Sequence, residues 1–170
     1  MAIVRLKKGE GRTVSAGGLW IFDNEIDTIS GDYTNGEVVK VIAWNDYPLG
    51  QGMLSLNSKI RIRLLTRDAD AVIDDAFWYR RLSQAWEYRK KTVDTSSCRL
   101  VFGEADFMPG IVIDKFEDVL VIESLFYGID RLKEKLLDIL KTILAQDGIV
   151  IRGIYERSDA LLLELVVDIF

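Results

Sequence analysis

An acidic turn near the middle of the chain carries the residues with the clearest chemical potential. Between the strand-like runs Leu100–Phe102 and Ile111–Ile113, the turn Gly103–Gly110 holds Glu104 and Asp106. Two carboxylates at a glycine-containing bend could bind Mg²⁺ or act as a general acid and base. In turns of this composition such side chains more often accept hydrogen bonds from the bend itself. The sequence therefore favours a turn-stabilising or interdomain role and keeps an unrecognised enzyme as an alternative.

The sequence contains no histidine, and this narrows the available mechanisms. Neither a Ser-His-Asp triad nor a Cys-His dyad nor a histidine metal site can be built. The single cysteine, Cys98, cannot form a thiolate cluster for zinc, and it matches no catalytic pattern. We expect an ordinary buried or half-buried thiol there, no metal and no catalytic residue.

Basic side chains in the first part of the chain form the candidate RNA-binding set. The segment Ser58–Leu65 alternates between apolar and cationic residues, which predicts a strand with one face of each kind. Cations on such a face could hold a phosphate backbone, whereas the spacing alone favours a solvated outer face with edge-protecting charges. The candidate residues are Lys7, Lys8, Arg12, Lys59, Arg61 and Arg63.

Two aromatic residues on either side of Ile21 allow two interpretations. Trp20 and Phe22 could be exposed side chains on which bases stack. Aromatic residues at such spacing beside a turn more often fill a core. We therefore predict that they pack inside the first domain.

The charge distribution limits the kinds of partner. Residues 1–67 carry nine Lys and Arg against seven Asp and Glu, and the remainder carries 13 against 20. An acidic total argues against indiscriminate coating of nucleic acid but permits a local basic face at the N-terminal part. No apolar run approaches the roughly 18–20 residues that span a bilayer. Together with the single cysteine, this predicts a cytoplasmic protein that does not bind membranes.

The pattern of residues changes from strand-like to helical along the chain. Strands are predicted at Val38–Ala43 and Leu49–Leu54, joined by the turn Trp44–Pro48. From Asp74 or Asp75 the apolar residues recur every three or four positions, which predicts a helix that ends near residues 89–91. Later elements are a strand at Val119–Leu125, a helix at Asp130–Leu144 and a strand at Ile149–Tyr155.

Several of these segments together resemble one protein family. Leu19–Ile26, Gly36–Val39 and Gly50–Arg63 resemble the RNA-binding PUA domain of the S-adenosylmethionine-dependent 23S rRNA (cytosine-5-)-methyltransferases of the large-subunit methyltransferase I type. Ile73–Arg89 is similar to the helix that follows this domain in the family, and Arg99–Phe116 to the start of its central domain. The match is collinear from about residue 3 to Asp159.

The resemblance implies an α+β fold, a PUA-like β-barrel domain followed by a small α/β domain. We expect a PUA-like RNA-binding domain at residues 1–70, a connecting helix at 71–95 and a central α/β domain at 96–170. Full-length members of the family use S-adenosylmethionine as cofactor. After Asp159 this sequence has no glycine-rich loop of that kind, and its only prolines are Pro48 and Pro109, which excludes the family's Asn-Pro-Pro motif. We expect no cofactor in this chain and a fragment that lacks the methyltransferase domain.

Three functions are consistent with these observations. The leading hypothesis is an RNA-binding portion of an rRNA cytosine-5 methyltransferase, which docks rRNA for methylation by the absent domain. The alternative is a stand-alone PUA-containing protein that binds RNA or another protein without catalysis, with the apolar tail Leu161–Phe170 as a contact for a homodimer. The third is the enzyme that would use Glu104 and Asp106.

Overall fold

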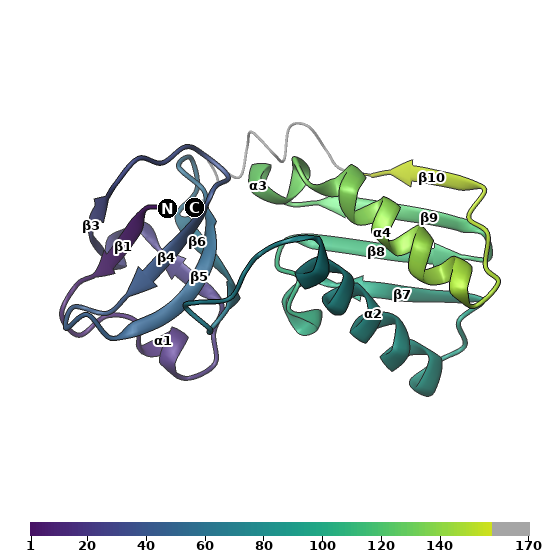
Figure 1. The fold of residues 1–170 in the computed structure, drawn as a ribbon, viewed down its shortest axis with the longest axis horizontal. Helices are drawn as coiled ribbons and strands as arrows, with labels where there is room; N and C mark the ends of the chain where they lie inside the picture. Colours follow the sequence, from purple (N-terminus) through teal and green to yellow (C-terminus); the bar gives the residue numbers. More distant parts are fainter. Residues whose placement is uncertain (158–170) are drawn as a thin grey trace. The chain divides into compact units, whose positions relative to one another are not determined.

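The computed structural model describes residues 1–157, which fall into two compact units (Figure 1). The first comprises Met1–Ala71 together with Phe126–Gly128, and the second begins at Val72 and resumes at Ile129. Each unit has its own sheet and its own core. The apolar tail Leu161–Phe170, on which the homodimer hypothesis was based, lies outside the described residues.

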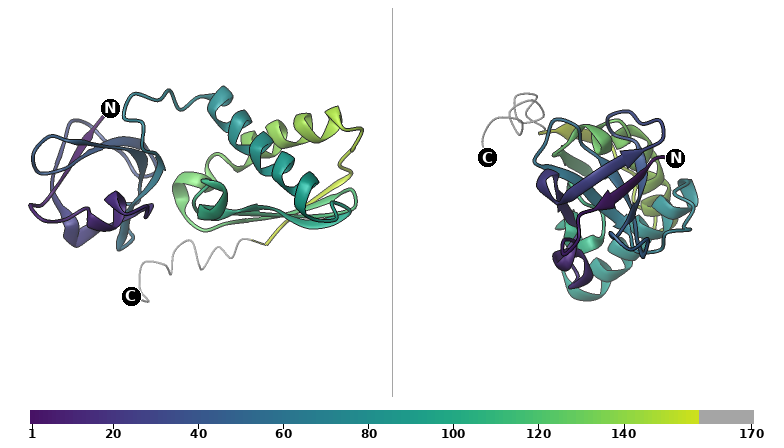
Figure 2. Two further views of the ribbon diagram at one scale, coloured as in Figure 1. Left: turned by 90° about the horizontal axis from the view of Figure 1, so that it is seen from below. Right: turned by 90° about the vertical axis from the view of Figure 1, so that its left-hand side faces the viewer.

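The first unit is built on a six-stranded sheet that curls around its core (Figure 2). The strand order is β2-β6-β5-β4-β1-β3; β1 runs parallel to β4, and the other pairs are antiparallel. A short helix, α1, and a 3₁₀ turn, η1, connect the strands. The elements are β1 (Ile3–Leu6), α1 (Arg12–Ser15), β2 (Trp20–Phe22), η1 (Asp23–Glu25), β3 (Ile26–Ser30), β4 (Val38–Ile42), β5 (Pro48–Leu54) and β6 (Ile60–Thr66).

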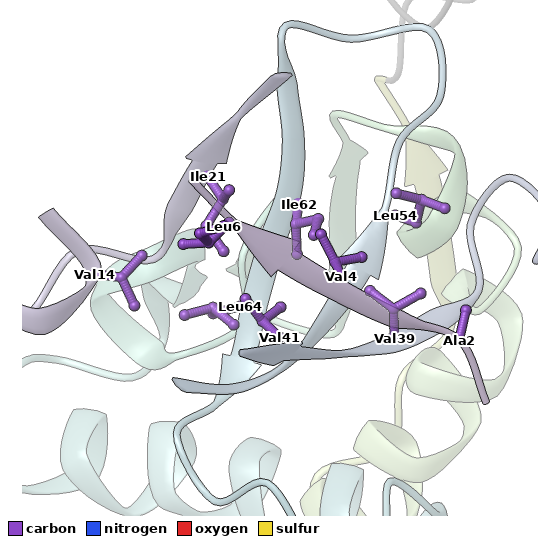
Figure 3. Close-up of a cluster of buried hydrophobic side chains, with 10 residues drawn as sticks. All are labelled: Ala2, Val4, Leu6, Val14, Ile21, Val39, Val41, Leu54, Ile62 and Leu64. Atoms are coloured by element: carbon purple, nitrogen blue, oxygen red, sulfur yellow. The ribbon is translucent and has the colours of Figure 1, made fainter. Parts of the chain in front are cut away.

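Alternation along these strands produces the core of the first unit. Aliphatic side chains from five strands and α1 point toward one another in Figure 3, and all are buried. Because successive strand residues point to opposite faces, Val4 and Leu6, and likewise Ile62 and Leu64, reach the same interior. The cluster consists of Ala2, Val4, Leu6, Val14, Ile21, Val39, Val41, Leu54, Ile62 and Leu64. The strands predicted around the turn 44–48 are confirmed as β4 and β5.

Two glycines let β5 approach β6 closely. Gly50 has a φ of +136°, which side-chain-bearing residues rarely adopt, and a Cβ on Gly52 would lie 2.6 Å from the carbonyl oxygen of Arg63. The pairing therefore depends on the absence of side chains at these two positions.

The predicted helix after residue 74 is confirmed as α2 (Asp75–Thr92), and its start has a clear physical cause. Asp74 adopts an extended conformation, and its Oδ1 accepts a hydrogen bond from the Phe77 N–H at 2.9 Å. This N-cap satisfies one of the amides that a helix start leaves unpaired. Arg89, Lys90 and Lys91 in the last turn complement the helix dipole.

The second unit is a two-layer structure in which α2 and α4 cover one face of a four-stranded sheet (Figure 2). The strand order is β10-β9-β8-β7, with β10 parallel to β9. Buried Ile111, Ile113, Leu120 and Ile122 alternate with less buried residues and pack under the helices. The other elements of this unit are β7 (Ser97–Phe102), η2 (Gly103–Asp106), β8 (Ile111–Phe116), β9 (Val119–Ser124), α4 (Lys133–Gln146) and β10 (Gly153–Glu156). The short helix α3 (Tyr127–Asp130) begins in the segment assigned to the first unit and ends in the second.

The helix predicted at Asp130–Leu144 is present as α4 (Lys133–Gln146) but starts later than predicted. One turn, α3, ends at Asp130, and α4 begins only at Lys133. Asp130 Oδ1 accepts hydrogen bonds from Ser124 Oγ at 2.7 Å and from Lys133 Nζ at 3.0 Å. This carboxylate is therefore anchored to the end of β9, and the helical periodicity alone did not reveal that anchor. The strand predicted at Ile149–Tyr155 begins later, at Gly153.

The architecture of the two units is mixed α+β, as the sequence predicted. Among residues 1–157 no helix is long and apolar enough to cross a membrane.

Candidate nucleic-acid interface

The 3₁₀ turn η1 brings together basic residues that are far apart in the sequence. On one side, the Lys7 N–H donates to the Glu25 carbonyl at 2.9 Å, and Lys7 Nζ donates to the Asn24 carbonyl at 2.7 Å. On the other side, the Asp23 N–H donates to the Lys59 carbonyl at 2.9 Å. Lys7 and Lys59 are both exposed, so two lysines from different strand ends flank this turn.

Glu25 organises this part of the surface from inside. Its side chain is buried, with Oε2 accepting from the Phe22 N–H at 2.7 Å and Oε1 from the Gly11 N–H at 3.4 Å. Gly11 precedes α1 and has a φ of +80°. Charge-assisted bonds of this kind are stronger than neutral ones, so Glu25 fixes the loop before α1 against the end of β2.

The loop before α1 presents the remaining N-terminal cations to solvent. Lys8 Nζ lies 5.3 Å from the ring centroid of Trp44, a cation–π distance, and both residues are exposed. Arg12 is also exposed and its Nε donates to the Gly9 carbonyl at 3.0 Å. The basic surface formed by Lys7, Lys8, Arg12 and Lys59 is called here the η1 ridge.

The cationic strand face predicted for β6 is not present as expected. Arg63 is only 5% exposed, and its guanidinium donates to Ser55 Oγ at 3.5 Å and to the Ile60 carbonyl at 3.4 Å. Arg61 is half-buried and donates to the carbonyls of Ser55 and Leu56. The prediction of a solvated outer face is therefore wrong for Arg63.

The burial of Arg63 follows from the position of its strand. β6 lies between β2 and β5, and Arg63 is directly opposite Trp20 on one side and Met53 on the other. The guanidinium carbon also lies 4.5 Å from the ring centroid of Phe126, so an aromatic face covers the charge. Among the residues predicted on this face, only Lys59, which precedes the strand, is exposed.

The core-filling prediction for Trp20 and Phe22 is also wrong. Their side chains are 41% and 39% exposed, whereas Ile21 between them is fully buried. Ile21 points into the core, and Trp20 and Phe22 lie on the opposite face of β2 because successive strand residues alternate. The strict alternation of residues 20–22 was the signal that could have found this. Phe22 immediately precedes η1 and adds an exposed aromatic side chain beside the ridge.

The acidic turn in the second unit forms a buried ion pair with α2. Asp106 accepts two hydrogen bonds from the Arg89 guanidinium, at 2.6 Å and 2.7 Å, and both side chains are only 10% exposed. Arg89 Nε also donates to the Arg99 carbonyl at 2.9 Å, and Asp106 Oδ2 accepts from the Phe102 N–H at 2.6 Å. The helical pattern placed residue 89 near the end of the predicted helix, but it did not identify Arg89 as the partner of Asp106.

These contacts bear on the chemistry considered for the turn. A carboxylate that is paired bidentately with arginine and bonded to the backbone holds the bend, and a cation would have to displace Arg89. Glu104 is half-buried in η2, where its carbonyl accepts from the Phe107 N–H at 3.1 Å. Within the described part of the chain, no three His, Cys, Asp or Glu side chains are grouped so that they could hold a metal. Burial raises the pKa of the Cys98 thiol, which makes it a poor nucleophile at neutral pH.

Comparison with known proteins first defines the class of the chain. Residues 4–67 match the model of a PUA-like domain, which corresponds to nearly all of the strands of the first unit. A candidate SAM-dependent methyltransferase from Streptococcus mutans shares the fold, with a TM-score of 0.77 at 14% identity over 93% of this chain and 41% of that one. A second solved structure, a candidate methyltransferase complexed with SAH, has a TM-score of 0.77 at 15% identity. The chain is a PUA-like domain followed by an α+β unit.

Sequence similarity then gives related proteins. "Ribosomal RNA large subunit methyltransferase I" from Aliivibrio fischeri is 35% identical over 159 residues, and that from Enterobacter sp. is 34% identical over 157 residues. The chain is homologous to a part of these methyltransferases: the match covers 92% of this chain but only 39% of the Aliivibrio protein.

Proposed function

We propose that this chain is the RNA-binding portion of an rRNA methyltransferase, and that its PUA-like domain docks rRNA through the η1 ridge. The observation that carries the proposal is the placement of Lys7 and Lys59 on the two sides of η1, beside the exposed ring of Phe22. The names of the relatives and the PUA-like match support the same assignment.

The chemistry of the ridge suits an RNA backbone next to unpaired bases. Lysine ammonium groups act as point charges for phosphates, and exposed aromatic rings offer stacking surfaces. The first 67 residues carry two more basic than acidic side chains, within a chain whose net charge is −5. The rest of the chain carries more acidic than basic side chains and therefore repels RNA. We expect the contacts with RNA phosphates at the cations of the η1 ridge.

The residues described here do not fit S-adenosylmethionine, the cofactor expected for the full-length family. Neither sheet has the doubly wound parallel topology in which a strand leads into a glycine-rich loop beside the cofactor. We therefore assign no methyl-transfer step to residues 1–157. Their proposed contribution is to hold the RNA.

Fluorescence anisotropy with labelled 23S rRNA fragments tests this proposal. The double variant Lys7→Glu/Lys59→Glu should weaken binding at least about tenfold and lower the salt dependence, because two phosphate contacts are lost. The matched control is Lys135→Glu/Lys141→Glu on α4, which changes the net charge by the same amount. Equal weakening by both double variants would show that only net charge matters and would remove the ridge from the role.

A further inference from the structure

An open hollow in the second unit lies between the end of α2 and the edge strand β7, which are adjacent in Figure 1. Its volume is about 530 Å³, within the range of sites that hold small organic groups. Its lining includes Tyr88 and Arg89 from α2, and Arg99 and Phe102 from β7.

The hollow combines aromatic rings with guanidinium groups. Tyr88 and Phe102 are both large exposed aromatic residues. The guanidinium carbon of Arg99 lies 5.0 Å from the ring centroid of Phe102, and that of Arg89 lies 5.3 Å from the centroid of Tyr88. Aromatic faces and guanidinium planes are the groups on which unpaired nucleobases stack in protein–RNA complexes.

The backbone of β7 disfavours an added peptide strand at the same place. An edge strand normally offers free N–H and C=O groups for β-augmentation. Here the Arg99 carbonyl already accepts from Arg89, the Phe102 N–H already donates to Asp106, and the register shifts between Arg99 and Val101. A ligand that binds through its π face does not need these groups.

The charges around the hollow also favour a stacking ligand over a simple anion. Arg99 donates to both carboxylate oxygens of Asp114, at 2.9 Å and 3.2 Å, and this pairing raises the pKa of Arg99 while offsetting its charge. Lys91 is exposed and lies three residues after Tyr88, on the same side of α2. Lys91 does not line the hollow itself, but it supplies a cation one helical turn from Tyr88 for the phosphate of a stacked nucleotide.

We infer that this hollow binds an unpaired nucleotide of the RNA, with the base against Phe102 and Tyr88 and the phosphate near Lys91. We call it the β7-edge site. The inference rests on the proposed RNA-binding function and adds a second contact, in the second unit, that acts by stacking.

Anisotropy with a short single-stranded RNA and the full chain tests the site. Phe102→Ala should weaken binding by about 5- to 150-fold, the effect of losing one stacked base, without changing the slope of affinity against salt. Phe116→Ala is the matched control, because Phe116 and Phe102 are both 51% exposed and Phe116 lies outside the hollow. Lys91→Glu should weaken binding and reduce the salt slope by about 0.7, because it removes one phosphate contact.

The outcomes separate this inference from the proposed function. If Lys7→Glu/Lys59→Glu weakens binding but Phe102→Ala behaves like Phe116→Ala, the β7-edge site is overturned and the η1 ridge stands; a protein ligand would then be the remaining occupant. If the unaltered chain binds no RNA, both proposals fall. Photocrosslinking with 4-thiouridine RNA should place the modified peptide within residues 88–102, and a crosslink confined to the first unit would also count against the site.

Discussion

Two buried carboxylates, one in each unit, hold turns in different ways. Glu25 in the first unit accepts hydrogen bonds from the N–H groups of Gly11 and Phe22. Asp106 in the second accepts one backbone N–H and a bidentate pair from Arg89. The first carboxylate is stabilised by local backbone dipoles, and the second by a countercharge from a helix.

The difference has consequences for how each turn responds to change. Removal of Glu25 leaves neutral amides without acceptors, whereas removal of Asp106 leaves a buried guanidinium without a countercharge. The second loss is larger, because an unpaired buried charge costs more than an unpaired amide. It also affects three elements at once, since Arg89 connects α2 to β7 and η2.

Asp106→Ala should give the largest loss of stability. We expect the free energy of unfolding of the second unit to fall by about 3–5 kcal/mol, the cost of breaking a buried ion pair from one side. Urea denaturation followed by tryptophan fluorescence measures this, in a background with Trp20→Phe and Trp44→Phe so that only the tryptophans of α2 report.

The double variant Arg89→Met/Asp106→Leu sharpens this test. It removes both charges, so it should be less destabilising than Asp106→Ala alone. The single variants Arg89→Met and Asp106→Leu complete the comparison. If the double variant loses as much stability as the sum of the two single variants, the two side chains act independently, contrary to the geometry.

Glu25→Gln should have a smaller effect, on the first unit. The amide keeps the shape of the side chain but retains only one acceptor oxygen, so one charge-assisted bond is lost, at about 1.5–3 kcal/mol. Urea denaturation with Trp20 and Trp44 as reporters measures the loss. RNA affinity should fall together with stability, whereas Lys59→Glu, at an exposed residue whose contact to η1 is through its backbone, should lower affinity alone. A Glu25→Gln variant with unchanged stability would contradict the role given to this residue.

A third carboxylate, Asp147, is more exposed and should contribute least to the stability of the folded chain. Its contribution should depend on pH. Hydrogen bonds from Lys90 at 2.8 Å and from Trp86 Nε1 at 2.6 Å hold the pKa of Asp147 below its ordinary value. In the unfolded chain its pKa returns to about 3.9. The stabilisation is therefore fully present above that pH and is lost as pH falls through the lower, folded pKa.

Urea denaturation of Asp147→Asn and of the parent chain at several pH values tests the direction of this pH dependence. The variant should be less stable at neutral pH, and the difference between the two urea midpoints should shrink as the solution is acidified. A difference that grows with acidification would mean that the pKa of the folded state is raised instead.

Local patterns predicted much of the fold, because local physics determines those elements. Alternation identified β4 and β5, and Asp74 marked the start of α2 since an N-cap acts within its own first turn. The later start of α4 was missed, because Asp130 accepts a hydrogen bond from Ser124 at the end of β9, far from the helical pattern itself.

The candidate sites were less predictable for the same reason. The burial of Arg63 depends on side chains from outside its own strand, and the exposure of Trp20 depends on which face of β2 turns toward the core. The proximity of Lys7 and Lys59 to η1 arises only when the sheet curls. Resemblance to the family supplied the PUA-like assignment, but it could not show which cations are exposed.

The arginine that closes the outer edge of β7 also has a consequence for handling the protein. An uncovered edge strand is a template for pairing with another chain, and Arg89 and Asp106 together occupy two of its backbone groups. Substitutions that break this pair would expose a nucleus for aggregation as well as weaken the unit. Loss of solubility, rather than loss of binding, would then be the first visible sign of damage in this turn.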